Sequence, residues 1–166
     1  MYSVYLRFMT DTKPLKRSEQ LAPLSREHHD GLLFVWKIRT GLKNGTDPGT
    51  LKQYTSWYWQ NHLESHLETE EEVLLTFLPS KSEMGQRIRS EHESIRELAS
   101  NAAKIDVNDL AMLADKLSDH IRFEERQLFN HLEETLSTEQ LNSIYLKLNH
   151  EQVCSVEWKE EFWNKK

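Results

Sequence analysis

The sequence has little of what small β-proteins and disulfide-rich domains depend on. It holds five glycines and four prolines in 166 residues, too few turn residues for a β-sandwich, which needs a turn about every ten residues. Cys154 is the only cysteine, which excludes an internal disulfide framework and a CxxC metal or redox motif. A single thiol is typical of a reducing compartment, and we expect a cytoplasmic protein.

Long apolar runs and an excess of positive charge are also missing. No stretch approaches the roughly 18 consecutive apolar residues of a membrane-spanning helix, and no apolar segment typical of a secretory signal stands near the N-terminus. The net charge of −6 makes nucleic acid an unfavourable partner. We therefore expect a protein that binds neither membrane nor nucleic acid, and the sequence points to no protein partner.

What the chain does have is the apolar spacing of long helices. The breaks in this spacing predict four long helices and a short fifth, with approximate bounds 26–43, 48–77, 82–104, 106–136 and 137 onward. Their expected N-terminal caps are Ser25, Asp47, Ser82, Asp106 or Asn108, and Ser137. Amphipathic helices with short connections predict an all-α, up-down-up-down four-helix bundle with a short extra C-terminal helix. We expect a loose lead-in at 1–13, the bundle at 14–150 and a tail at 151–166.

The predicted inward stripes carry polar residues that an apolar core would exclude. Burying an isolated carboxylate costs several kcal/mol unless it is paired or bound to a metal. One pattern occurs twice: a single histidine on one helix, then a histidine and a glutamate four residues apart on one face of the next. The residues of the doubled pattern are His28, His66, Glu70, His92, His120 and Glu124.

The chemistry of these six side chains suits a transition metal. Imidazole with carboxylate favours iron, zinc or manganese over calcium or magnesium. Two histidines for each metal, with two glutamates able to bridge, would make a dinuclear site. Such metals would keep open positions for water, dioxygen, peroxide or nitric oxide. Because the histidines must be neutral to bind, we expect metal loss and lower stability as the pH falls through about 6 toward 4.

Several neighbouring residues leave alternatives open. His29 competes with His28 for the inward position, although His28 keeps the phase of the apolar stripe. His62 is a further ligand, a group that hydrogen-bonds a ligand, or a residue lining the end of the bundle. Tyr58 closes the pocket, donates to a bound oxygen species or simply packs.

Three other features complete these expectations. Gly31 leaves room for a small ligand or allows close helix approach. Glu71 and Glu125 follow the two motif glutamates and are expected at the surface. The aromatic tail, with Trp158, Phe162 and Trp163, either covers the bundle or forms a patch for a partner.

The four segments that carry these residues resemble the hemerythrin-like (HHE cation-binding) family. They are REHHDGLLFVWKIR at 26–39, HLESHLETEEEVLLTFLP at 62–79, SEHESIREL at 90–98 and DHIRFEERQLF at 119–129. The resemblance implies a four-helix bundle with two non-haem irons bridged by Glu70 and Glu124 and by an oxo or hydroxo group. One iron would take His28 and His66, and the other would take His92 and His120. Manganese or zinc in place of iron fits the same donors.

The details of the motifs resemble those of the bacterial H-HxxxE-H-HxxxE branch of that family. The oxygen-carrying members have a second histidine four residues from the first on the third helix, where this chain has Ile88 and Arg96 around His92. The resemblance therefore implies binding of dioxygen or a related small oxidant in sensing, storage or detoxification. A di-iron enzyme that decomposes peroxide or reduces nitric oxide is an alternative. A metal-free or zinc-bound helical adaptor, supported by the aromatic tail, is another.

Overall fold

The computed structural model describes residues 17–148 and 157–164, and every regular element in these ranges is a helix. The predicted lead-in at 1–13 and the start of the tail, 151–156, lie outside the described residues. The α-helices are α1 (Ala22–Asn44), α2 (Pro48–Tyr58), α3 (Glu64–Val73), α4 (Glu83–Ser100), α5 (Val107–Phe123), α6 (Phe129–Thr135) and α7 (Thr138–Leu148). Two π-helical turns, η1 (Trp59–Leu63) and η3 (Glu124–Leu128), and a 3-10 turn, η2 (Leu75–Phe77), complete the set.

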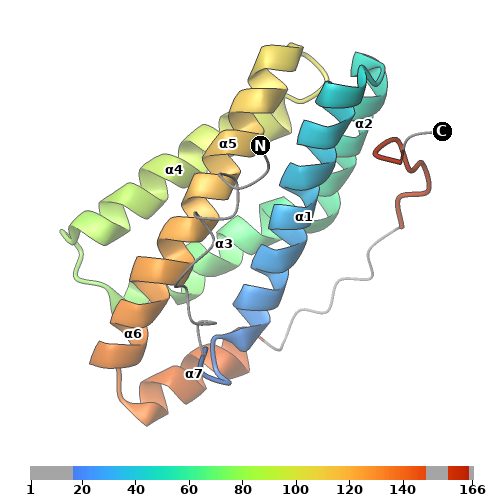
Figure 1. Cartoon of the computed structure of the whole chain (residues 1–166). Helices are drawn as coiled ribbons and strands as arrows, with labels where there is room; N and C mark the ends of the chain where they lie inside the picture. Colours follow the sequence, from blue (N-terminus) through green and yellow to red (C-terminus); the bar gives the residue numbers. More distant parts are fainter. Residues whose placement is uncertain (1–16, 149–156, 165–166) are drawn as a thin grey trace, which may run out of the picture.

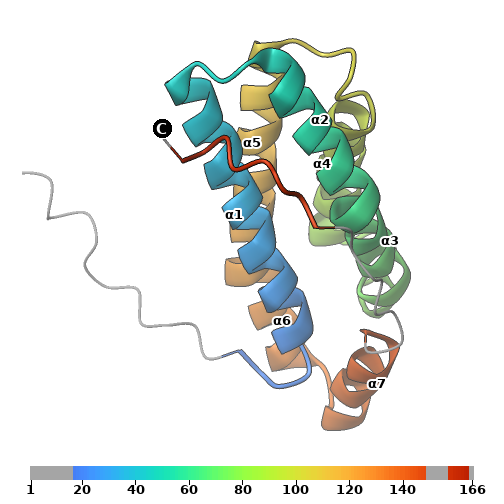
Figure 2. The same cartoon turned by 90° about the vertical axis from the view of Figure 1, so that its right-hand side faces the viewer.

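The helices form four parallel columns. They are α1, then α2 with η1 and α3, then α4, and finally α5 with η3 and α6, and the short α7 lies across one end (Figure 1). The view turned by 90° shows α1 in front of α5 and α6, and α2 and α3 in front of α4 (Figure 2). The all-α bundle with a short extra helix is therefore confirmed. In the described part of the chain no helix is long and apolar enough to cross a membrane.

Side-chain caps fix the starts of most helices where the sequence predicts them. A carboxylate or hydroxyl that accepts from a free backbone N–H replaces the hydrogen bond that the first turn lacks. Such caps are made by Asp47 to Thr50, Ser82 to Gly85, Asp106 to Asn108 and Asp109, and Ser137 to Gln140. At its other end α1 closes on Gly45, whose φ of 71° lies in the left-handed region that favours glycine.

Two of the predicted boundaries are wrong. The helix α1 begins at Ala22, before Ser25, with Leu21 at its cap position and Pro23 in its first turn. Proline suits a first helical turn because that turn leaves backbone N–H groups unbonded in any case. Ser25 instead donates its hydroxyl to Glu125 at 2.7 Å. The helix α4 ends at Ser100 rather than near 104.

The two long helices predicted at 48–77 and 106–136 each contain a π-helical turn. The turn η1 lies just before the helix that carries His66, and η3 begins at Glu124. A π-turn adds about one residue to a helical turn, so it changes which side chains face inward on either side of it. Single π-turns occur frequently at functional sites.

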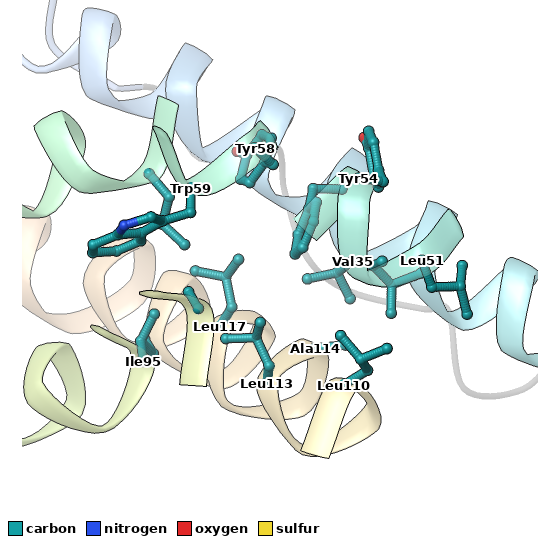
Figure 3. Close-up of a cluster of buried hydrophobic side chains, with 14 of the residues drawn as sticks. Val35, Leu51, Tyr54, Tyr58, Trp59, Ile95, Leu110, Leu113, Ala114 and Leu117 are labelled. Atoms are coloured by element: carbon teal, nitrogen blue, oxygen red, sulfur yellow. The ribbon is translucent and has the colours of Figure 1, made fainter. Parts of the chain in front are cut away.

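The core consists of two apolar clusters with a polar layer between them. One cluster includes Phe34, Leu67, Ile95 and Leu117, and part of it is drawn in Figure 3. The other includes Leu24, Leu74, Ile88 and Phe129. On α4, His92 stands between Ile88 of one cluster and Ile95 of the other. The apolar clusters hold the columns together and leave the polar residues in a buried middle layer.

Candidate metal centre

The structure brings the six residues of the doubled pattern into that middle layer. They form two groups that share both glutamates: His28, His66, Glu70 and Glu124, and Glu70, His92, His120 and Glu124. In each group the potential ligand atoms lie within 4.8 Å of one another, and all six residues are buried. Each group can hold a metal ion, and the shared carboxylates lie between the two positions. The buried histidine of α1 is His28, at 2 % exposure, whereas His29 is exposed.

Each of the four histidines also has a carboxylate of its own on the outer side of the ring. The Nδ1 atoms of His28 and His66 donate to Glu125 at 2.8 Å and to Glu27 at 2.7 Å. Those of His92 and His120 donate to Glu71 at 2.8 Å and to Glu91 at 2.9 Å. An ionised carboxylate only accepts hydrogen bonds, so it fixes the proton on Nδ1 and leaves Nε2 free for a metal.

The prediction that Glu71 and Glu125 are simple surface residues is wrong. Each is half-buried and bonds a histidine on a different helix: Glu71 bonds His92, and Glu125 bonds His28. The sequence holds a signal for this, because a glutamate directly precedes His28 and His92 and directly follows Glu70 and Glu124. The doubled pattern is thus longer than six residues, and its outer glutamates connect the helices in the same way in both halves.

Arginines hold three of these outer carboxylates. Arg17 lies 2.9 Å from Glu125, Arg96 lies 3.1 Å from Glu71, and Arg87 lies 2.6 Å from Glu91. A hydrogen-bonded carboxylate keeps its histidine in one orientation, which is how surrounding residues tune a metal site.

The donor set fits a metal, because several inner atoms lack a partner without one. Glu124 is fully buried, and its Oε1 has no hydrogen-bond donor within the described part of the chain. Its Oε2 lies 3.1 Å from His28 Nε2 and 3.3 Å from His120 Nε2, and Glu70 Oε2 lies 3.3 Å from His92 Nε2, so histidine nitrogens face these two oxygens. A buried charge without such partners is strongly unfavourable. The Nε2 atoms of His92 and His120 face each other at 3.1 Å. A cation between these nitrogens and oxygens would satisfy all of them.

Without metal, protons supply part of the missing positive charge. Burial by itself would lower the pKa of His120, but the charge of Glu124 and hydrogen bonds with Glu70 and Glu91 raise that pKa to about 10. The pKa of His28 is likewise raised well above its usual value, because hydrogen bonds to Glu124, Glu125 and Glu70 outweigh its burial. Burial opposes ionisation of Glu70, yet the surrounding histidines lower its pKa well below the usual value. In the metal-free centre, His28 and His120 therefore favour the imidazolium form and Glu70 favours the carboxylate form.

A cavity of about 480 Å³ opens onto one side of the centre only. Its walls include His28 and His66 from the polar layer, but neither His92 nor His120. Gly31 also lines it, and a Cβ atom on this residue would meet Ile121 Cδ1 at 2.8 Å. Of the two potential metal positions, one faces a cavity and the other is enclosed by side chains.

The structure also places the residues whose roles the sequence left open. His62 is not in either group of potential ligands, and it lines the cavity with its ring 5.2 Å from that of Tyr58. Tyr58 lines the cavity as well, and burial raises the pKa of its hydroxyl. In the tail, Phe162 and Trp158 pack against the first apolar cluster, so the described part of the tail covers the bundle.

Comparison with known proteins agrees with this geometry. No curated protein and no solved structure matches the chain. The family model described as the hemerythrin HHE cation binding domain matches residues 24–132, which is more than half of the chain and contains all six residues of the doubled pattern. The chain therefore belongs to the hemerythrin HHE cation-binding domain family.

Proposed function

We propose that this protein holds two non-haem iron ions bridged by carboxylates, and that it binds dioxygen or a related small oxidant in sensing, storage or detoxification. One observation carries the proposal: two four-residue groups of buried potential ligands share Glu70 and Glu124. His28 and His66 would hold one ion, and His92 and His120 would hold the other. Imidazole with carboxylate suits iron, and manganese and zinc are the competing metals.

The protein's own residues determine what such a centre can do. Bound iron would supply redox chemistry and open coordination positions for a small molecule. The histidine–glutamate pairs keep each Nε2 directed inward, and the apolar clusters bury the polar layer on both sides along the bundle. Four-helix bundles build metal sites in their cores from inward glutamates and histidines on facing helices.

The cavity indicates where the small molecule arrives. It reaches His28 and His66, so an incoming oxidant would approach the metal position that these two residues would hold. Tyr58 stands in the same cavity with a hydroxyl that stays protonated, because burial raises its pKa. This hydroxyl can donate a hydrogen bond to a bound oxygen species.

The same cavity favours a second candidate function, decomposition of peroxide or reduction of nitric oxide. Both reactions need an ion that a small molecule can approach, and the His28 side offers one. The adaptor alternative loses its main support because the described tail aromatics pack on the bundle. The cytoplasm is the proposed compartment, supported by the single thiol, Cys154.

The test is metal analysis of protein purified from iron-supplemented cells, together with an absorption spectrum in air. We expect roughly two irons per chain with near-ultraviolet oxo-bridge bands. His66→Ala and His120→Ala should each lower the iron content, whereas His29→Ala, which changes the exposed neighbour of His28, should leave it unchanged. No bound iron, or equal iron in all variants, would exclude the di-iron centre. Continuous oxygen release from added peroxide would favour the enzyme, and a single stoichiometric reaction would favour the binding protein.

A further inference from the structure

A chain of tyrosine and tryptophan rings leads from the cavity to the outside of the bundle. Tyr58 lines the cavity. Its ring stacks on Phe34 at 4.2 Å between centroids and lies 6.4 Å from the ring of Trp57. Its Oη would lie 3.7 Å from a Cβ atom on Gly31, three residues after His28. Tyr58, the inner end of this series of rings, therefore lies beside a residue that is about one helical turn from a potential metal ligand.

The outer end of this series of rings lies in the C-terminal segment. The ring of Trp57 lies 5.8 Å from that of Trp158. Tyr54 connects the same rings by a second route, at 5.5 Å from Trp57, 5.2 Å from Trp158 and 6.0 Å from Trp163. Trp57, Trp158 and Trp163 are all half-buried, so each presents an edge to solvent. Figure 2 shows the C-terminal segment lying along α1 and α2.

Two other tryptophans show that this arrangement is not shared by all large aromatics of the chain. Trp59 is buried in the first apolar cluster, and in Figure 3 it lies on the side of Ile95, away from Tyr54. Trp36 is 50 % exposed on α1 and does not belong to the series of ring contacts from Tyr58 to Trp158. Three of the five tryptophans thus join two tyrosines in one continuous set of ring contacts.

We propose that Tyr58, Trp57 and Trp158, with Tyr54 and Trp163 as a parallel branch, form an electron relay between the cavity and a soluble thiol. This inference rests on the proposed function, since it needs an oxidant in the cavity. Neighbouring phenol and indole rings exchange single electrons readily when they are in contact, and both side chains can be oxidised reversibly. The relay would let the protein complete the reduction of an oxidant without damage to its own metal ligands.

The steps balance for hydrogen peroxide as the oxidant. Tyr58 gives one electron to the peroxide in the cavity and releases its phenolic proton there. Trp57 then gives one electron to oxidised Tyr58, which takes a proton back, and Trp158 gives one electron to Trp57. A thiol at the surface gives one electron to Trp158 and loses its proton to solvent. Two such passes with two protons convert one peroxide to two waters, while two thiols form one disulfide.

The environment of Tyr58 suits its position as the first member. Burial raises the pKa of its hydroxyl, so reduced Tyr58 returns to the protonated phenol after each pass. At the outer end, Trp158 Nε1 donates to the carbonyl of Glu160 at 2.7 Å, which holds the indole in place.

The experiment treats iron-loaded and iron-free protein with limiting hydrogen peroxide and maps oxidised residues by mass spectrometry. In the iron-loaded protein we expect oxidation of Trp158 and Trp163 to exceed that of Trp36, which reports direct attack from solvent. Iron-free protein should show no such excess, and added dithiothreitol should remove it. Freeze-quenched samples should show a tyrosyl or tryptophanyl radical by electron paramagnetic resonance.

Conservative variants test the route. Tyr58→Phe keeps the ring that stacks on Phe34 and removes only the oxidisable hydroxyl, so the excess at Trp158 should be lost. Trp57→Phe should reduce it, and Trp36→Phe, a matched change outside the relay, should leave it unchanged. Equal oxidation of Trp158 and Trp36 in protein that holds two irons would overturn the relay and leave the di-iron centre intact. Failure to bind iron at all would overturn the proposed function, and the relay with it.

Discussion

Metal binding to the metal-free protein should release about two protons per chain near pH 7. The raised pKa values of His28 and His120, the latter about 10, mean that both imidazoles are protonated at this pH when no metal is present. A metal ion binds only neutral imidazole, so both protons must leave. The ion then supplies the positive charge that Glu70 and Glu124 require.

The number of protons sets the pH dependence of the affinity. Each released proton changes the apparent affinity about tenfold per pH unit, which is about 1.4 kcal/mol. One proton at each of the two metal positions therefore gives about a tenfold gain for each ion from pH 7 to pH 8, and about a 100-fold gain in the product of the two binding constants. Competition by protons thus begins well above the pH of 6 that ordinary histidines would suggest. A water molecule that binds between the ions as hydroxide would release one further proton, so it would raise the number of protons released.

Isothermal titration calorimetry measures this release directly. Zinc is titrated into metal-free protein in buffers with different ionisation enthalpies, and the slope of heat against ionisation enthalpy gives the number of protons. His120→Gln should lower the count by about one. A wild-type slope near zero would refute the reasoning, because it would mean that neither His28 nor His120 carries a proton in the metal-free centre.

The remaining predictions concern stability and exchange. In metal-free protein, the raised pKa of His120 adds stability that is fully present below about 6.5 and lost as the pH rises toward about 10. Glu125, whose pKa is lowered to about 2 because hydrogen bonds from His28 and Ser25 outweigh its burial, adds stability that is lost as the pH falls below about 4.5. The melting temperature of metal-free protein should therefore be highest between these two pH values, whereas that of metal-loaded protein should rise toward pH 8. Identical dependence of the two melting temperatures on pH would contradict this. Glu71→Gln and Glu125→Gln should each weaken metal binding about 10- to 100-fold, while the exposed Glu93→Gln should have no effect in the same competition assay with a chelator. Since the cavity reaches only one metal position, EDTA should remove one equivalent faster than the second, and His66→Ala should abolish the fast phase; a single phase in wild-type protein would show that the cavity does not control exchange.

The amino-acid sequence is sufficient to predict the helices and the residues of the buried polar layer. Helical periodicity is a local property, so the apolar spacing around His28 and around His120 places both side chains on inward faces without knowledge of the partner helix. The caps at Asp47 and Asp106 are equally local, because the side chain bonds the backbone two or three residues ahead. The start of α1 is the exception, since Ser25 is drawn to Glu125 on another helix instead of capping its own.

The outer glutamates and the cavity depend on relations between helices. Glu71 bonds His92, and Glu125 bonds His28, only because packed helices take a particular rotation and shift along their axes, which no local pattern specifies. The π-turns at Trp59–Leu63 and Glu124–Leu128 change the inward face within a single helix, so a regular period does not predict them. The doubled pattern is nearly symmetric in the sequence, and its two halves differ in the structure because one half faces a cavity and the other is packed. The sequence by itself therefore determined the bundle and its polar layer, whereas the tertiary structure decided which carboxylate orients which histidine and which metal position is open, because both depend on contacts across helices.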